Sequence, residues 1–243
     1  MSRRAALPGG ASARLLAVVA SVLLVALTVG ACSSSGGSGP SSAQDLATRL
    51  ARAKSALDSA GSITIKLKTD QLPSGVTGLL EADGTGTHAP AFKGSVTVSP
   101  GAGSVSADVV AVNGKDYAKL GFSPVWAPLD PSQYGAPDPA LLFKPGAGVS
   151  AFLTHTTHLV AGGQVRSGQD VLTQVKGTLP GSAVASVIPS ADKAKSFSVT
   201  YQLSDGDQVR QAVITGPFYA GHSDVTYTLT LETSSTDVSI TAP

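Results

Sequence analysis

The sequence predicts an α+β domain in which a curved antiparallel β-sheet has several helices covering its apolar face. Three observations indicate this fold class. One amphipathic helical segment precedes a long series of segments in which apolar and polar residues alternate. Most gaps between these segments are short and rich in Gly, Pro, Asp and Asn, which favours antiparallel connections. Helical segments interrupt the strands instead of alternating with them, which argues against a βαβ arrangement.

The first 31 residues have the pattern of a cleaved export signal. A basic start with three arginines is followed by an apolar run over residues 15–28 and by small residues before Cys32. A permanent membrane helix is the alternative, but a bilayer span needs about 20 apolar residues. This run is limited by Arg14 and Gly30. The pattern therefore predicts a signal peptide over residues 1–31.

Residues 29–32, Val-Gly-Ala-Cys, resemble the lipobox of bacterial lipoproteins, in which the cysteine thiol receives diacylglycerol before cleavage. Cys32 is the only cysteine in the chain, so an internal disulfide is impossible. The alternative is a chance cysteine in a linker. Several acyl chains, at about 0.8 kcal/mol per buried CH2, would hold the protein at a membrane. We expect lipidation of Cys32 and an anchor on the extracytoplasmic face of the plasma membrane.

The mature chain has the charge and length of one acidic domain. Removal of residues 1–31 takes away three of the 17 basic residues and none of the 16 acidic ones, which leaves a formal charge of −2. This balance does not suggest nucleic-acid binding. Residues 32–42 have the composition of a flexible tether. Residues 43–243 are predicted to form a single domain, because no second linker or repeat divides them.

The domain is predicted to begin with a helix over residues 43–60. Ser42 can cap its N-terminus, Asp45 lies in the first turn, and Gly61 ends the helix. Apolar residues recur on one helical face at spacings of 4, 3 and 4: Leu46, Leu50, Ala53 and Leu57.

The strands follow from period-two alternation. It begins at residue 63 and returns in residues 92–98, 105–112, 197–203, 225–231 and 238–240. Asn113-Gly114 predicts a two-residue hairpin between residues 105–112 and 115–120, and Asp205-Gly206 predicts another. Helical segments are expected near residues 138–143, 149–158 and 181–188. The residues expected to face inward are Ile63, Ile65, Leu67, Phe92, Val96, Val98, Val105, Val109 and Val225.

The sequence offers no strong catalytic or metal-binding motif. His155 and His158 are only two ligands, which makes a weak metal site. Residues 146–151 fit a dinucleotide fingerprint superficially but follow a proline-rich loop instead of a strand. Neither a G-x-S-x-G elbow nor a P-loop occurs. We therefore expect no enzyme, metal or cofactor, with an unrecognised lipid-modifying activity as the alternative.

Several segments resemble the LppX/LprAFG lipoproteins of mycobacteria and their relatives. These are residues 88–94 (HAPAFKG) and 110–120 (VAVNGKDYAKL). The LprG branch is resembled particularly at Trp126 and in residues 130–139 (DPSQYGAPDP), 177–181 (GTLPG), 215–219 (TGPFY) and 225–231 (VTYTLTL). The resemblance covers nearly the whole mature chain in order.

The resemblance implies a half-barrel with helices on its concave face and a large apolar cavity for acyl chains. The implied ligands are acylated glycolipids or triacylglycerol, carried from the plasma membrane toward the outer envelope. A major-facilitator-type exporter is the implied membrane partner, and release of the protein from its anchor is an open alternative. The inward residues above would line the cavity, and Tyr134 would stand at its mouth or in a surface loop. Without the resemblance, dense packing would favour a filled core. Two further functions therefore stay open, a structural or adhesive surface lipoprotein and the solute-binding subunit of a transporter.

Overall fold

A computed structural model describes residues 41–101, 103–134 and 136–243. The segment Ser38–Pro243 forms one compact unit that contains every element given below and both hydrophobic clusters, so the packing that stabilises the fold lies within it. The predicted signal peptide, Cys32 and most of the predicted tether lie outside the described residues. Among the described helices, none has the length and apolar character needed to cross a membrane.

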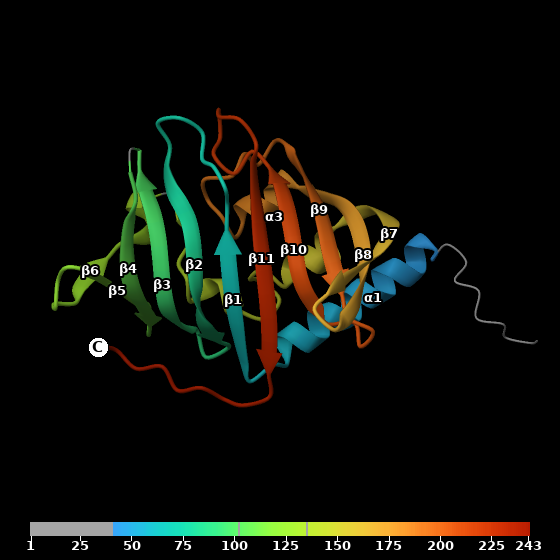
Figure 1. Ribbon diagram of the computed structural model, residues 1–243, viewed down its shortest axis with the longest axis horizontal. Helices are drawn as coiled ribbons and strands as arrows, with labels where there is room; N and C mark the ends of the chain where they lie inside the picture. Colours follow the sequence, from blue (N-terminus) through green and yellow to red (C-terminus); the bar gives the residue numbers. More distant parts are fainter. Residues whose placement is uncertain (1–40, 102, 135) are drawn as a thin grey trace, which may run out of the picture. The chain divides into compact units, whose positions relative to one another are not determined.

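The described residues form an eleven-stranded antiparallel sheet (Figure 1). Its order is β6-β5-β4-β3-β2-β1-β11-β10-β9-β8-β7, so β6 and β7 are the edges and the sheet does not close. The strands are β1 (Ser62–Lys68), β2 (Thr77–Thr87), β3 (Ala91–Pro100), β4 (Val105–Val112), β5 (Lys115–Leu120), β6 (Ala127–Leu129), β7 (Thr157–Ser167), β8 (Asp170–Pro180), β9 (Ser196–Leu203), β10 (Val209–Gly216) and β11 (Val225–Ser234).

The helical segments are few and mostly short. They are α1 (Ala43–Asp58), the 3-10 helices η1 (Pro131–Tyr134) and η2 (Leu141–Phe143), α2 (Ala151–His155) and α3 (Gly181–Ala185). The capping of α1 is confirmed: the Ser42 hydroxyl accepts the Asp45 N–H at 3.1 Å, and the Asp45 carboxylate accepts the Ser42 N–H at 3.1 Å. The four apolar residues predicted for its face are all buried.

Alternation assigns each strand residue to one of two faces. We call the face that carries Ile65 and Leu231 the inner face, because α1, η2, α2 and α3 pack against it in the main hydrophobic cluster. Phe92, Val109, Val199 and Ile214 lie in the same cluster. The predicted apolar-in, polar-out pattern is thus present, with the helices on the apolar face.

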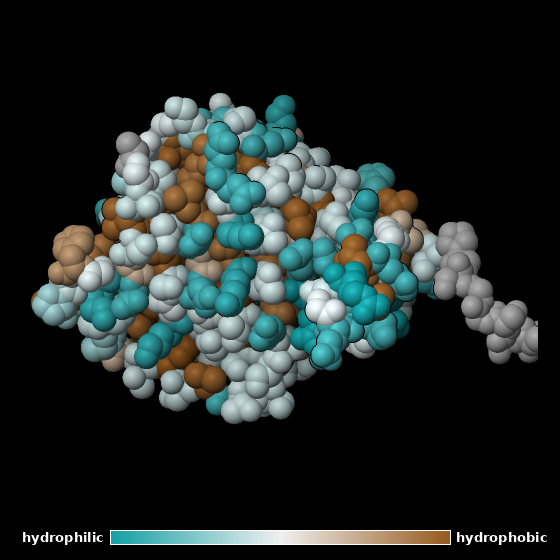
Figure 2. Space-filling model, viewed as in Figure 1, coloured by the Kyte–Doolittle hydropathy of each residue, from teal (hydrophilic) through white to brown (hydrophobic). Residues whose placement is uncertain are grey.

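The outer face is mostly polar. Its middle carries threonines of β11, among them Thr226 and Thr230. Figure 2 shows this face as largely white and teal with scattered brown patches. The C-terminal segment runs back across the sheet beyond the end of β11 (Figure 1). There Ile240 and Trp126 pack on Val110 and Val112 in a small second cluster.

Several predicted elements need correction. Residues 238–240 are not a strand, because the chain leaves the ladder after Ser234, and Ile240 then packs in the second hydrophobic cluster. The helix expected over residues 149–158 ends at His155, and β7 begins at Thr157. In the second hairpin the positive φ of 56° falls on Asp207, and Ser204 N–H donates to the Gln208 carbonyl across a longer turn. The Asn113-Gly114 turn is confirmed, with φ of 56° and 67°.

Candidate functional site

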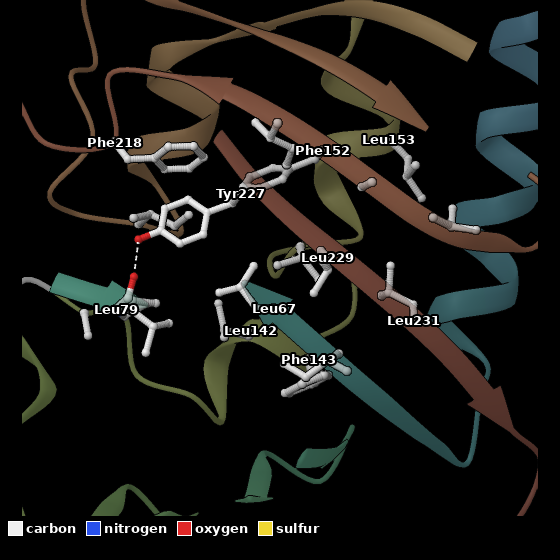
Figure 3. A pocket seen from close by; sticks show the side chains of 18 of the residues that line it. Leu67, Leu79, Leu142, Phe143, Phe152, Leu153, Phe218, Tyr227, Leu229 and Leu231 are labelled. Atoms are coloured by element: carbon white, nitrogen blue, oxygen red, sulfur yellow. Dashed lines mark hydrogen bonds between the residues drawn. The ribbon is translucent and has the colours of Figure 1, made fainter. Parts of the chain in front are cut away.

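An apolar pocket lies between the inner face and the helical segments. Figure 3 shows side chains of β1 and β11, such as Leu67 and Leu229, converging with Leu142 and Leu153 from the helical side. None of the described residues that line it is charged. The wall is formed by Leu57, Ile65, Leu67, Leu79, Ala136, Pro137, Leu142, Phe143, Val149, Phe152, Leu153, Ile188, Ser190, Tyr201, Val209, Ala212, Ile214, Phe218, Tyr219, Tyr227, Leu229 and Leu231.

The free space in this pocket is small, at about 120 Å³. An engineered apolar cavity of about 150 Å³ holds one benzene. Pockets that bury a drug-sized ligand measure about 300–1,000 Å³. In this conformation the pocket therefore has room for a short hydrocarbon segment and not for a lipid with several tails.

Glycines beside the pocket make room for aromatic rings. Phe143 of η2 stacks on Phe92 of β3, with ring centroids 6.0 Å apart and planes 7° from parallel. A Cβ on Gly86 would overlap the Phe143 ring, and one on Gly84 would overlap Phe92. The missing side chains of β2 thus allow η2 to sit close to the sheet and to close this side of the pocket.

Three tyrosines and Ser190 bring hydroxyl groups to a wall whose other side chains are hydrocarbon. The Tyr227 hydroxyl donates to the Leu79 carbonyl at 2.6 Å and lies 2.9 Å from the Tyr219 hydroxyl. The Tyr201 hydroxyl lies 2.9 Å from Thr156 Oγ1. Burial raises the pKa of Tyr201 and Tyr227 above the ordinary phenol value, so both remain protonated. These groups are neutral, and none of the described residues beside them in the wall carries a charge that would pair with an ionic headgroup.

The helical side of the pocket is tied to the end of α1 by two side chains. Asp58 accepts the Ser150 hydroxyl at 2.6 Å and also pairs with Lys54. Burial alone would raise the pKa of Asp58, but the hydrogen bonds from Lys54 and Ser150 lower it overall. The His88 ring places Nδ1 2.7 Å from the Phe143 carbonyl and Nε2 2.9 Å from the Leu57 carbonyl.

The nine predicted inward residues do not all lie at this pocket. Ile65 and Leu67 line it, and Ile63 lines a smaller neighbouring cavity beside His88. Phe92, Val109 and Val225 are buried in the main cluster, and Val96 packs against it. Val98 is half-buried and Val105 is 36% exposed. The two residues pair with each other near the C-terminal end of β3 and at the start of β4.

The remaining site predictions concern Tyr134 and the two histidines. Tyr134 lies in η1 and is 40% exposed, while Ala136 and Pro137 just after it line the pocket. His155, the last residue of α2, places Nδ1 2.7 Å from the carbonyl of Ala151, the first residue of that helix. Within the described ranges, no group of three or more potential ligands is arranged to hold a metal ion.

Sequence reasoning missed most of the wall. Tyr227, Leu229 and Leu231 follow Val225 at steps of two in a predicted strand, so continuing that alternation would have found them. Phe143, Phe152 and Leu153 belong to segments expected to be helical, but spacing does not show which helical residues face a pocket. Tyr219 lies in a loop after β10 and had no local signal.

Comparison with solved structures supports the fold. LprF of Mycobacterium bovis matches with a TM-score of 0.68 at 16% identity, over 84% of this chain and 99% of that chain. The lipoprotein LppX of Mycobacterium tuberculosis matches with a TM-score of 0.61 at 20% identity, over 82% of this chain and 100% of that chain. At these identities the likeness shows the fold alone. No curated protein sequence matches this chain significantly.

The family prediction is confirmed by a comparison of sequence families. The model of the LppX/LprAFG lipoproteins matches residues 43–242, which is nearly the whole of the predicted domain. The placement nearest to the LprG branch stays a prediction. By the extent of this match, the chain belongs to the LppX/LprAFG lipoprotein family.

Proposed function

We propose that this protein binds acylated lipids with their hydrocarbon tails in the apolar pocket and carries them through the cell envelope. The observation that carries this proposal is an uncharged wall between sheet and helices in a domain whose outer face is polar. A lipid tail can cross an aqueous layer only if its apolar surface stays covered, at about 25 cal/mol per Å2. The pocket supplies such cover, and carrying a lipid requires no chemical reaction. The proposed function is therefore that of a carrier and not of an enzyme.

The cargo and route are part of the proposal and rest on the family. Acylated glycolipids or triacylglycerol would be carried from the plasma membrane toward the outer envelope, with a major-facilitator-type exporter as partner. Acylated Cys32 would keep the protein at the extracytoplasmic face of the plasma membrane while it loads. In this proposal the half-barrel with a large enclosed cavity, which the family resemblance implies, is the shape that the sheet and its helices take when a lipid is bound.

This function requires the pocket to widen, because about 120 Å³ is too little for a multi-tailed lipid. The inner strands are held on both sides by ladder hydrogen bonds, as β1 is by β2 and β11. The segment from η2 to α2 is held mainly by packing and by contacts such as those of His88 and Asp58. The helical side is therefore the part that moves outward when a lipid enters.

Native mass spectrometry of the purified Ser38–Pro243 unit, followed by organic extraction, tests the proposal. We expect a stoichiometric acylated lipid that exchanges with added glycolipid. Ala212→Phe places a ring in the pocket from β10 and should abolish the bound lipid, because the free volume is near that of one benzene. The matched control is Val213→Phe, which points to the outer face of the same strand and should keep the lipid.

The small free volume favours one other function, a structural surface lipoprotein with a nearly filled core. The same experiment separates the two. A protein that purifies without lipid and also refuses added glycolipid and triacylglycerol would refute the carrier proposal and support the structural one.

A further inference from the structure

The hydrogen-bond directions around the three pocket tyrosines are fixed by proton count. A carbonyl oxygen only accepts, so Tyr227, which contacts the Leu79 carbonyl, donates its proton there. The Tyr219–Tyr227 contact must then use the Tyr219 proton, since a hydroxyl has only one. The Leu79 N–H in turn donates to the Tyr219 oxygen at 3.3 Å. The protons of Tyr219 and Tyr227 are thus both used in a closed ring of hydrogen bonds that begins at the N–H of Leu79 and ends at its carbonyl. The dashed line at the Tyr227 hydroxyl in Figure 3 marks one bond of this set.

The third tyrosine follows the same rule. Thr156 Oγ1 donates to the Phe152 carbonyl at 2.7 Å, because that carbonyl cannot donate. Tyr201 therefore donates to Thr156 Oγ1 at 2.9 Å. Thr156 is buried and Tyr201 is 2% exposed, so water does not compete for this bond. All three phenolic protons in the wall are already used in hydrogen bonds within the protein.

Consequently the tyrosines look polar in the sequence but offer a ligand no proton. Their oxygens keep some capacity to accept, and Ser190 carries the remaining side-chain hydroxyl of the described wall. A methylene group makes no hydrogen bonds to water, so it gives up none when it packs against such a wall. A ketone, ester or ether oxygen placed against the three tyrosines loses its bonds to water and finds no donor among them in return.

We infer that this pocket selects acyl chains that carry no hydrogen-bond acceptor on the part in contact with Tyr201, Tyr219 and Tyr227. The inference rests on the proposed function and specifies which acyl chains the same pocket binds best. It places ester linkages and sugars of a bound lipid outside the tyrosine region and leaves only plain hydrocarbon inside. A chain with a ketone at that depth should bind about fivefold to a hundredfold more weakly than the plain chain, the range expected for an unpaired buried carbonyl.

Two substitutions at one hydrogen bond give a matched test. Thr156→Val removes the acceptor and keeps the shape, so the Tyr201 proton becomes free to serve a ligand. Tyr201→Phe removes the same hydrogen bond together with its proton, so nothing is freed. Both variants lose the Thr156–Tyr201 contact, and only one gains a donor in the pocket.

A second variant releases a proton at the other tyrosine site. Tyr227→Phe removes the acceptor of Tyr219, so the Tyr219 proton loses the partner that it has in the unmodified protein. This variant does not touch Thr156, so it tests the inference independently if Thr156→Val fails to fold.

The experiment measures dissociation constants of the Ser38–Pro243 unit for octadecanoic acid and for a set of oxo-octadecanoic acids with the ketone at successive positions. The unmodified protein should prefer the plain chain over at least one oxo isomer by about fivefold or more. Thr156→Val and Tyr227→Phe should each reduce that preference about threefold to tenfold, the value of one recovered hydrogen bond. Tyr201→Phe should keep it. Because each result is a ratio within one variant, a general loss of stability cancels.

The outcomes separate this inference from the proposed function. If the plain chain binds and every oxo isomer binds equally well, the selectivity is wrong while lipid binding stands. Equal changes in Thr156→Val and Tyr201→Phe would also overturn it, since the freed proton would then have no role. If no chain binds at all, the proposed function and the inference fall together.

Discussion

Asp207 is expected to hold α1 against the turn between β9 and β10. Its carboxylate pairs with Arg49 at 2.5 Å and with Arg52 at 2.6 Å. The side chains of Asp207 and Arg49 are 11% and 19% exposed, while that of Arg52 is 59% exposed. Loss of one partner costs about 3–5 kcal/mol in a fully buried pair and about 0.2–1 kcal/mol at the surface. For Asp207→Asn we therefore expect a loss of about 2 kcal/mol in the free energy of unfolding at pH 7. Asparagine tolerates the positive φ of 56° at this position, so the backbone stays unstrained.

The pH dependence of this loss gives the sharper test. Burial alone would raise the pKa of Asp207, but the hydrogen bonds and charges of Arg49 and Arg52 lower it overall. A lowered pKa in the folded state means that the stabilisation is present above the ordinary carboxyl pKa and is lost as the pH falls through the folded value. Urea unfolding of Ser38–Pro243, followed by circular dichroism, measures the free energy at both ends of that range.

The matched control is Asp83→Asn, because Asp83 pairs with Lys66 at 3.4 Å but both side chains are more than half exposed. Its loss should stay below about 1 kcal/mol at every pH. The reasoning about Asp207 is refuted if its substitution costs no more than this control at pH 7, or if the cost is the same in acid.

Three further results are expected from unfolding measurements on the same unit. Asp116→Asn should stabilise the protein, because burial first, and then Asp138 and Asp130, raise the pKa of Asp116 to about 6. Its folded form binds the extra proton between about pH 4 and 6, so the advantage of Asn grows over that window and is constant above it, and an advantage independent of pH would contradict this. Gly86→Ala should cost about 1–3 kcal/mol because its Cβ overlaps the Phe143 ring, whereas Gly163→Ala, with open space at its Cβ, should cost little. Ile240→Ala should cost about 1 kcal/mol through the outer cluster, and a similar loss in the exposed control Val238→Ala would argue against it.

Local signals were enough for the elements that local chemistry decides. The capping box at Ser42 and the spacing of four apolar residues define α1. Asn113-Gly114 determines its hairpin because both residues adopt positive φ. These elements were predicted because the residues that stabilise them are neighbours in the sequence.

The strands that were missed have their causes elsewhere in the chain. β2 contains Gly78, Gly84 and Gly86, and such a composition argues against a strand. The structure explains each glycine by a distant ring, since a Cβ would overlap Tyr219, Phe92 and Phe143 respectively. β7 breaks its alternation at Gly162-Gly163, where the register with β8 shifts. A strand that yields space to side chains far away in sequence cannot show the regular period of one that fills its own space.

The pocket was hard to predict for the same reason, and its chemistry was harder still. Alternation gives the face of a residue, and it placed Ile65 and Phe92 on the same side of the sheet. Only the helical segment that includes η2 decides that Ile65 lies at the pocket while Phe92 stacks on the Phe143 ring. Whether a tyrosine offers its proton depends in turn on one further contact, such as that of Tyr201 with Thr156. Since Thr156 precedes Tyr201 by 45 residues, the hydrogen-bonding character of the wall is a property of the folded chain and not of its sequence pattern.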